Sequence, residues 1–223
     1  MILRILALAV LLVVNGVGVV RADALEILDR SQWGAAPAVT QRAKPIENRA
    51  TGSRRVAAEN AMPKRGEARY LTVHHTARTA SAKPLAQNLK SFQRQMFSYR
   101  IDYGNGTEKQ IFLGDLPYHF FISADGSIGE GRELRYAAYS NTTYSTPISQ
   151  HITVVLDGNF ERSEPTQEQL NALIALLDEL SARFDIPLEN IGGHRDVAQT
   201  LCPGKLLTRQ MPAIIEAIKA RRG

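Results

Sequence analysis

The chain has 223 residues, of which 44% are hydrophobic and 22% charged, and its formal net charge is +5 at pH 7. This length suffices for one domain with a hydrophobic core, and no internal repeat divides it. The mild positive charge fits an anionic polymer or surface. No basic run is interleaved with aromatic residues, so nucleic-acid binding is not expected. A single cysteine, Cys202, excludes a disulfide within the chain.

Residues 1–24 predict a secretory signal peptide. Arg4 precedes an apolar run from Ile5 to Val20, and small residues follow, ending at Ala24. We expect cleavage after Ala24, export to the periplasm or the medium, and no stable membrane anchor. An uncleaved signal anchor is the alternative, although the apolar run is shorter than the ~20 residues of a membrane span.

Residues 25–69 predict an N-terminal segment and surface extension, because residues 41–69 are polar, basic and without an apolar period. The main domain is expected over residues 70–223. Residues 69–76 alternate and have strand composition, which predicts a strand. Apolar residues of 84–99 recur near helical spacing and predict an amphipathic helix. A long loop is expected to follow and to run to Pro117.

The second half of the chain predicts two more strand regions and two long helices. Asp125-Gly126 separates residues 118–123 from 127–131 and indicates a hairpin. Residues 151–156 are apolar enough for a central strand. A capping box from Thr166 to Gln169 opens a helix that ends near Asp185, and a last helix is expected from about 210 to 221, with Pro212 in its first turn. Together these elements predict an α/β fold, a single domain with a central mixed β-sheet flanked by helices.

Three residues could form a metal site. A catalytic zinc needs three protein ligands and one open position for water. His74, His194 and Cys202 would supply two nitrogens and a sulfur. The interval from His194 to Cys202 does not place both on one helix face, but a loop bounded by Gly192-Gly193 and Pro203-Gly204 can turn both side chains to one ion. This spacing alone is weak evidence.

Strand alternation distinguishes two adjacent histidines. His74 shares a face with Thr72, whereas His75 shares the face of Leu71 and Val73. We therefore interpret His75 as a packed residue and His74 as the ligand. The alternative, that both are structural histidines, stays open on this strand alone.

Several short motifs follow one another along the chain. They are Ser31-Gln-Trp33-Gly-Ala35, Val73-His-His-Thr-Ala77, Tyr118-His-Phe120, Asp125-Gly126 with Glu130-Gly-Arg132, Gly158-Asn-Phe160, Gly193-His-Arg-Asp196 and Thr200-Leu-Cys-Pro-Gly204. In this order they resemble the motifs of the peptidoglycan recognition proteins and the phage lysozyme-type zinc amidases, jointly the type 2 N-acetylmuramoyl-L-alanine amidases. The resemblance extends from about Leu28 to Leu207.

The resemblance implies a hydrolase with one zinc ion per chain, held by His74, His194 and Cys202, that cleaves the amide between N-acetylmuramic acid and L-alanine. Tyr118 matches a catalytic position whose hydroxyl faces the scissile carbonyl. Thr200 matches a position that helps to hold the polarised oxygen. The implied partners are peptidoglycan or muropeptides, and Arg195 could meet a carboxylate of the stem peptide.

Two other functions compete with the amidase. One is a non-catalytic peptidoglycan-binding or sensing protein on the same fold, in which a serine often replaces the cysteine. The other is a thiol hydrolase that uses Cys202 with His194. Glu133-Leu134 and Ala137-Ala138-Tyr139 depart from family positions linked to stem-peptide contacts, so stem preference is not predicted. The sequence also does not predict the oligomeric state or the roles of residues 41–69 and 98–117.

Overall fold

The computed structural model describes residues 25–48, 53–60, 62–97, 99–102, 108–111, 113–140 and 146–223. The predicted signal peptide, residues 1–24, lies outside these residues. Within them, no helix has the length and apolar character that crossing a membrane requires.

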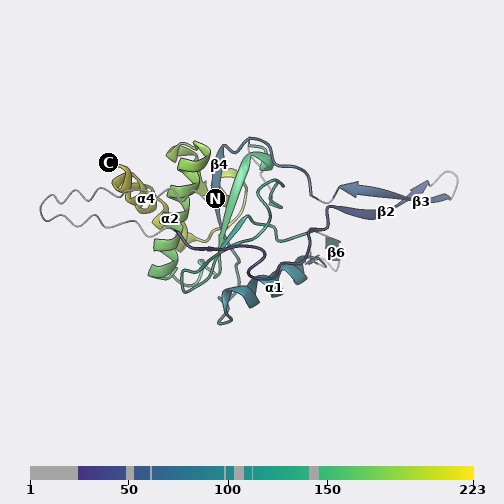
Figure 1. Cartoon of the computed structure of the whole chain (residues 1–223), viewed down its shortest axis with the longest axis horizontal. Coiled ribbons are helices and arrows are strands. Elements are labelled where there is room, and N and C mark those ends of the chain that lie inside the picture. The colour runs from purple at the N-terminus through teal and green to yellow at the C-terminus, as the bar shows by residue number, and fades with distance from the viewer. Residues whose placement is uncertain are drawn as a thin grey trace, which may run out of the picture.

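A six-stranded mixed sheet forms the centre of the fold (Figure 1). Within this sheet β7 (Phe120–Ile122) and β8 (Ile128–Glu130) pair antiparallel, and the other neighbours pair parallel. The predicted α/β domain with a central mixed sheet is therefore confirmed, as are its strand at 69–76, its hairpin around Asp125-Gly126 and its strand at 151–156. In spatial order the strands are β1 (Ile27–Leu28), β8 (Ile128–Glu130), β7 (Phe120–Ile122), β9 (His151–Leu156), β4 (Tyr70–His75) and β10 (Ile191–Gly193).

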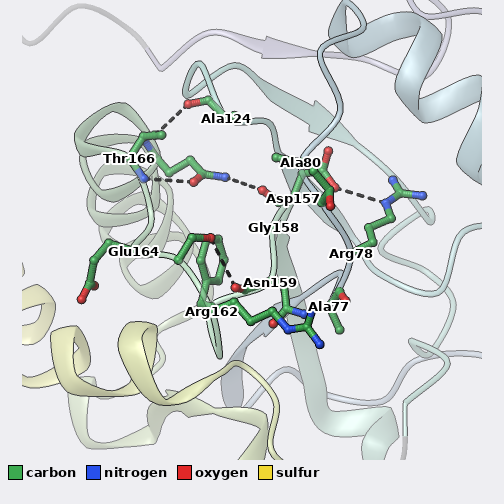
Figure 2. Close-up of a pocket in the computed structure, with 14 residues that line it drawn as sticks. Ala77, Arg78, Ala80, Ala124, Asp157, Gly158, Asn159, Arg162, Glu164 and Thr166 are labelled. Carbon is green, nitrogen blue, oxygen red and sulfur yellow. Dashed lines mark hydrogen bonds and ion pairs between the residues drawn. The ribbon is translucent and has the colours of Figure 1, made fainter.

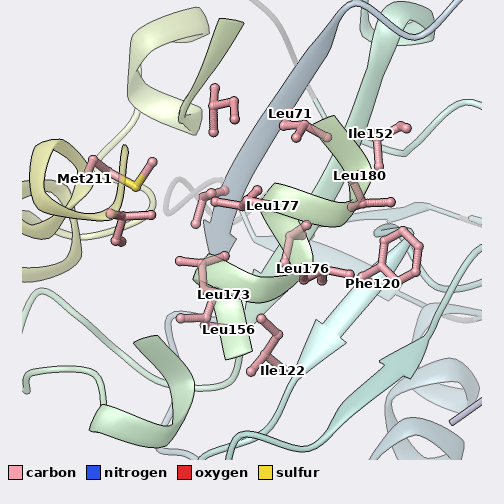
Figure 3. Close-up of a cluster of buried hydrophobic side chains, with 14 of the residues drawn as sticks. Leu71, Phe120, Ile122, Ile152, Leu156, Leu173, Leu176, Leu177, Leu180 and Met211 are labelled. Carbon is pink, nitrogen blue, oxygen red and sulfur yellow. The ribbon is translucent and has the colours of Figure 1, made fainter. Parts of the chain in front are cut away.

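Helices cover both faces of the sheet. The alternation of side chains along β9 divides the core, because Val154 packs in a cluster with α2 (Gln167–Phe184) and α4 (Lys205–Arg222), whereas Val155 packs in a second cluster with α1 (Leu85–Met96). Figure 3 shows the first cluster, in which leucines of α2 lie over the strands. A short helix, α3 (His194–Val197), and two 3-10 turns, η1 (Ile148–Gln150) and η2 (Leu188–Asn190), complete the helical elements of the described residues.

The predicted capping box opens α2. The Thr166 side chain accepts a hydrogen bond from the Gln169 amide at 3.0 Å, and the Gln169 side chain accepts one from the Thr166 amide at 3.2 Å. These bonds satisfy two N–H groups that the first turn leaves without helical partners. The helix ends where predicted, at Asp185, whose φ of 51° is left-handed.

The last helix begins earlier than predicted. It starts at Lys205, so Pro212 lies inside the helix and not in its first turn. The loop after β9 explains the early start, because it supplies acceptors for the first amides. Glu161 Oε1 accepts from the Lys205 amide at 2.7 Å, and the Phe160 carbonyl accepts from the Leu206 amide at 3.0 Å.

Two hairpins occur where the sequence indicated no strands. The strands β2 (Gln41–Asn48) and β3 (Ser53–Asn60) pair antiparallel and form a ribbon that projects from the body (Figure 1). The expected loop before Pro117 likewise contains an antiparallel pair, β5 (Tyr99–Asp102) and β6 (Glu108–Ile111).

Candidate active site

The fold brings three predicted ligands together. His74 lies near the end of β4, and His194 directly follows β10, which pairs parallel with β4 so that Gly193 lies opposite Val73. Cys202 lies in the turn before α4. Candidate ligand atoms of the three residues all lie within 4.8 Å of one another. The Cys202 Sγ is 3.6 Å from His74 Nδ1, and the His74 and His194 rings are 4.4 Å apart between centroids.

Backbone hydrogen bonds hold the cysteine in place. The Arg195 amide donates to the Cys202 carbonyl at 2.8 Å, which ties the turn to the start of α3. The Cys202 amide donates to Thr200 Oγ1 at 3.2 Å, and the His75 amide donates to Cys202 Sγ at 3.4 Å. Asp196 accepts from the Gly193 amide at 2.8 Å. The Asp196 side chain thus shapes the turn that carries His194.

This arrangement fits a zinc ion. Tetrahedral zinc with bonds of about 2.0 to 2.3 Å places its donor atoms about 3.3 to 3.8 Å apart, a range that includes the distance from Cys202 Sγ to His74 Nδ1. The candidate ligand atoms that lie farthest apart, at most 4.8 Å, would have to approach each other by about 1 Å to bind the same zinc ion. His74 is 1% exposed and its Nε2 has no hydrogen-bond partner, so the rest of the described protein does not fully satisfy this buried imidazole.

Burial shifts the pKa of two of the three donors, His74 and Cys202. It lowers the pKa of His74 well below its ordinary value, and the neighbouring His194 adds to this effect. Burial also raises the pKa of Cys202 to about 12, although the hydrogen bond from the His75 amide opposes the shift. A thiol with this pKa is protonated at neutral pH, and a cation beside the sulfur is one of the features that lower a thiol pKa.

The predicted catalytic positions flank the three donors. The Tyr118 ring lies 4.9 Å from the His74 ring between centroids, and Tyr118 comes just before β7. Thr200 is held beside Cys202 by the amide contact described above. Arg195 is partly exposed and follows His194 directly in α3.

One further residue contacts the site, and sequence reasoning missed it. Ser140 Oγ lies 3.2 Å from His194 Nε2. A hydrogen bond of this kind fixes the orientation of a ligand histidine. Ser140 lies far from His194 in the chain and within none of the motifs considered, so no signal in the sequence pointed to it.

The other histidines pack as structural residues. His75 is buried, and its Nδ1 accepts from the Phe160 amide at 3.3 Å, which agrees with its predicted packed role. His119 Nδ1 accepts from the Thr153 amide at 3.0 Å, so its Nε2 donates to the Tyr136 carbonyl at 2.9 Å and the ring is neutral. His151 is fully buried and contacts Thr72 Oγ1 through Nδ1 at 2.7 Å.

A buried arginine shapes the loop that precedes Tyr118. Arg132, from the Glu130-Gly-Arg132 motif, is 2% exposed and donates to four carbonyls, those of Leu113, Asp115, Leu116 and Ala137. Trp33, in the first motif, is fully buried and donates to the Glu130 carbonyl at 2.7 Å. Both motifs therefore have structural roles around the site.

A polar hollow of about 510 Å³ opens at the carboxyl ends of β4 and β9 (Figure 2). Beneath it, the buried Asp157 accepts from the Arg78 side chain at 3.3 Å and from Thr76, Asn88 and the Ser81 amide, each at 2.9 Å. Asp157 is thus fully engaged in holding the loop after β4. None of the three candidate metal ligands lines this hollow.

Comparison with known proteins defines the class. The family described as N-acetylmuramoyl-L-alanine amidase matches residues 64–205, and the chain belongs to this family. Peptidoglycan recognition protein 1 of Bos taurus is 31% identical over 197 residues, which cover 87% of this chain and 86% of that protein. The N-acetylmuramoyl-L-alanine amidase of Homo sapiens is 28% identical over 68% of this chain and 26% of its own length.

Solved structures share the fold. A mutant of Drosophila PGRP-LB in complex with tracheal cytotoxin aligns with a TM-score of 0.58 and 21% sequence identity, over 84% of this chain and 93% of that chain. The resemblance to peptidoglycan recognition proteins and type 2 amidases that the motifs indicated is therefore confirmed. The family contains proteins named for recognition and proteins named for hydrolysis, so the site has to discriminate between them.

Proposed function

We propose that this protein is a zinc-dependent N-acetylmuramoyl-L-alanine amidase, which hydrolyses the amide between N-acetylmuramic acid and L-alanine in peptidoglycan. The observation that supports this proposal is the convergence of His74, His194 and Cys202 beside Tyr118. A zinc ion in this site would supply Lewis-acid polarisation of the amide carbonyl and activation of the attacking water.

Each residue has a distinct part in the proposed reaction. The Tyr118 phenol donates a hydrogen bond to the oxyanion that develops on the substrate carbonyl, and the Thr200 hydroxyl assists; one such donor is typically worth about 3 kcal/mol. The attacking water gives up a proton when it adds to the carbonyl, and Tyr118 helps to pass this proton to the leaving amine. The His75 amide stabilises negative charge on Cys202 Sγ. Arg195 binds a carboxylate of the stem peptide.

The proposed substrates are peptidoglycan and muropeptides. Family membership supports a peptidoglycan-related substrate, and one structural neighbour was solved with tracheal cytotoxin. The protein acts after export and cleavage behind Ala24, with one zinc ion per chain.

A non-catalytic recognition protein is the second candidate, because the bovine relative at 31% identity is named for recognition. The intact set of three donors favours hydrolysis over this candidate. A thiol hydrolase is less favoured, because its nucleophile has to be a thiolate and burial raises the pKa of Cys202 to about 12.

Mass analysis of muropeptides separates the three functions. Purified protein is incubated with sacculi, alone, with a chelator, and with a chelator followed by excess zinc. The amidase releases free peptides and leaves glycan without peptide substituents, loses this activity with chelator and regains it with zinc. Turnover that survives the chelator would indicate a thiol hydrolase, and no turnover under any condition would indicate a recognition protein.

A further inference from the structure

The loop that ends at Tyr118, residues 113–118, contains neither helix nor strand, and its first five residues are buried. Buried carbonyl groups in such a loop need donors from elsewhere in the protein. Arg132 donates to three of them at 2.6 to 3.5 Å, those of Leu113, Asp115 and Leu116. The Arg132 amide also donates to the Tyr118 carbonyl at 2.7 Å. One buried residue thus holds much of the backbone that leads to the proposed catalytic phenol.

Asp115 is the one acidic residue of this loop, and it is fully buried. Its Oδ1 accepts from the Leu116 amide and from Gln93 Nε2, each at 2.8 Å. Its Oδ2 lies 2.9 Å from Arg30 Nη2 and has no other partner among the described residues. Burial lowers the pKa of Arg132 to about 10, and Asp115 opposes this shift. Because a buried carboxylate is unfavourable without a direct counterion, the loop conformation depends on Arg30.

Arg30 connects this loop to the N-terminal segment. Its side chain is 15% exposed and also donates to the carbonyls of Gly131 and Ala36. Ala36 is held in turn by Gln93 of α1, whose side chain accepts from the Ala36 amide at 2.9 Å and donates to its carbonyl at 3.0 Å. Arg30 lies before residue 64, where the range that matches the amidase family begins, and it belongs to none of the sequence motifs.

The loop determines where the Tyr118 phenol lies relative to the metal donors. The Tyr118 ring lies 4.9 Å from the His74 ring and 6.5 Å from the Phe92 ring between centroids. The three donors belong to other segments, namely β4, α3 and the turn before α4. A shift of residues 113–118 would therefore move the phenol and leave the donors in place. A displacement of about 1 Å can lower the rate of a catalysed reaction by about 100-fold.

We propose that Arg30 is a positioning residue for catalysis. Its ion pair with Asp115 fixes residues 113–118, and this loop holds the Tyr118 hydroxyl where the oxyanion develops. This inference rests on the proposed function for the reaction that Tyr118 serves. The hydrogen bonds and the ion pair of Arg30 involve none of the three metal donors, so Arg30 acts on the reaction through Tyr118.

Three variants test this role in steady-state kinetics of zinc-loaded protein on a soluble muropeptide. Arg30→Gln removes the cation beside Asp115, and Arg30→Lys keeps a positive charge there. Arg69→Gln is the matched control, because it breaks an exposed ion pair with Glu67. We expect Arg30→Gln to lower kcat by about tenfold with KM and zinc content unchanged, Arg30→Lys to retain most of kcat, and Arg69→Gln to behave as the unaltered protein does.

A double-mutant cycle separates positioning of the phenol from a general effect on the fold. In Tyr118→Phe the hydroxyl is absent, so its position no longer matters to the rate. We therefore expect Arg30→Gln to lower the remaining kcat of Tyr118→Phe by less than about twofold. A residue that only stabilises the fold would lower kcat by the same factor with and without the hydroxyl.

Fluorine NMR of protein labelled with 3-fluorotyrosine reports on the loop without turnover. The chain has seven tyrosines, and the resonance that is missing in Tyr118→Phe belongs to Tyr118. We expect Arg30→Gln to shift or broaden this resonance and to leave that of Tyr70, which stacks on His151, unchanged. Circular dichroism confirms folding. If Arg30→Gln does not fold, Arg30→Gln/Asp115→Asn replaces it with the same expectations, because it leaves no unpaired buried charge.

The possible results separate this inference from the proposed function. An unchanged kcat, an equal loss with and without the Tyr118 hydroxyl, or an unchanged Tyr118 resonance would overturn the positioning role. A loss of zinc from Arg30→Gln would also overturn it, because Arg30 would then act on the metal site. A shifted Tyr118 resonance in a protein that binds zinc but cleaves no muropeptide would retain the link from Arg30 to Tyr118 and contradict the proposed amidase.

Discussion

At the residue scale, the sequence predicted some side chains of the candidate site and missed others. His74 was separable from His75 because alternation along one strand places them on opposite faces, and the structure directs His74 toward Cys202 while His75 packs against Phe160. His194 and Cys202 came from motifs. Ser140 could not be predicted, because its contact with His194 depends on how a loop without a motif folds back.

A Tyr118 variant tests whether the phenol hydroxyl stabilises the oxyanion. Replacing Tyr118 with Phe removes the donor hydroxyl and keeps the ring beside His74. We expect kcat to fall by about 100-fold, with zinc content unchanged, because the lost hydrogen bond stabilises the transition state and not the metal. Steady-state kinetics on a soluble muropeptide and metal analysis check this, and an unchanged kcat would remove the role.

Variants of Ser140 test whether its hydroxyl orients His194 for zinc binding. Changing Ser140 to Ala should weaken zinc affinity by about tenfold, because the imidazole loses the hydrogen bond that orients it. Competition with a chromophoric chelator measures the affinity. Ser140→Thr keeps a hydroxyl and should restore most of it, and Ser163→Ala removes an exposed hydroxyl elsewhere and should have no effect. Equal affinities in all variants would show that Ser140 does not position the ligand.

At the element scale, the regular core was predictable and the hairpins were not. The strand at 151–156 and the helix opened by Thr166 have strong local patterns, and both formed where expected. The sequence of the β2 and β3 strands is polar and basic and shows no apolar alternation, so no strand was predicted there. The early start of α4 depends on acceptors from Phe160 and Glu161, which are distant in sequence.

The junction between Cys202 and α4 gives a prediction at this scale. Gly204 has a φ of +95°, and a Cβ there would lie 2.4 Å from the Phe160 carbonyl carbon. We expect Gly204→Ala to lower the free energy of unfolding by about 2 to 4 kcal/mol through strain and displacement. Denaturant titration measures this. Gly66→Ala, where the nearest contact is an ordinary 3.6 Å, should change stability little, and equal effects would contradict the explanation.

At the scale of the whole molecule, buried histidines make folding depend on pH. Burial lowers the pKa of His119 and His151 to about 4, from an ordinary value of 6.5. Between these values the unfolded chain binds protons that the folded chain does not. The free energy of unfolding is therefore highest above about pH 6.5 and decreases as the pH falls toward about 4.

We expect the metal-free protein to be less stable at pH 5 than at pH 7.5, by about 2 kcal/mol for each of these histidines. Denaturant titrations with chelator present at both pH values measure the difference, so that loss of metal cannot cause it. His119→Gln or His151→Gln should reduce the pH dependence if the variant folds. Equal stability of the unaltered protein at the two pH values would contradict the assignment.

We propose that His74, His194 and Cys202 together bind one zinc ion and leave one coordination position open. X-ray absorption at the zinc edge, on protein loaded with zinc and freed of excess metal, tests it most directly. We expect one zinc per chain with one sulfur and three nitrogen or oxygen neighbours, and we expect Cys202→Ser to lose the sulfur neighbour while the fold remains. A protein that retains no zinc, or a zinc without a sulfur neighbour, would contradict it.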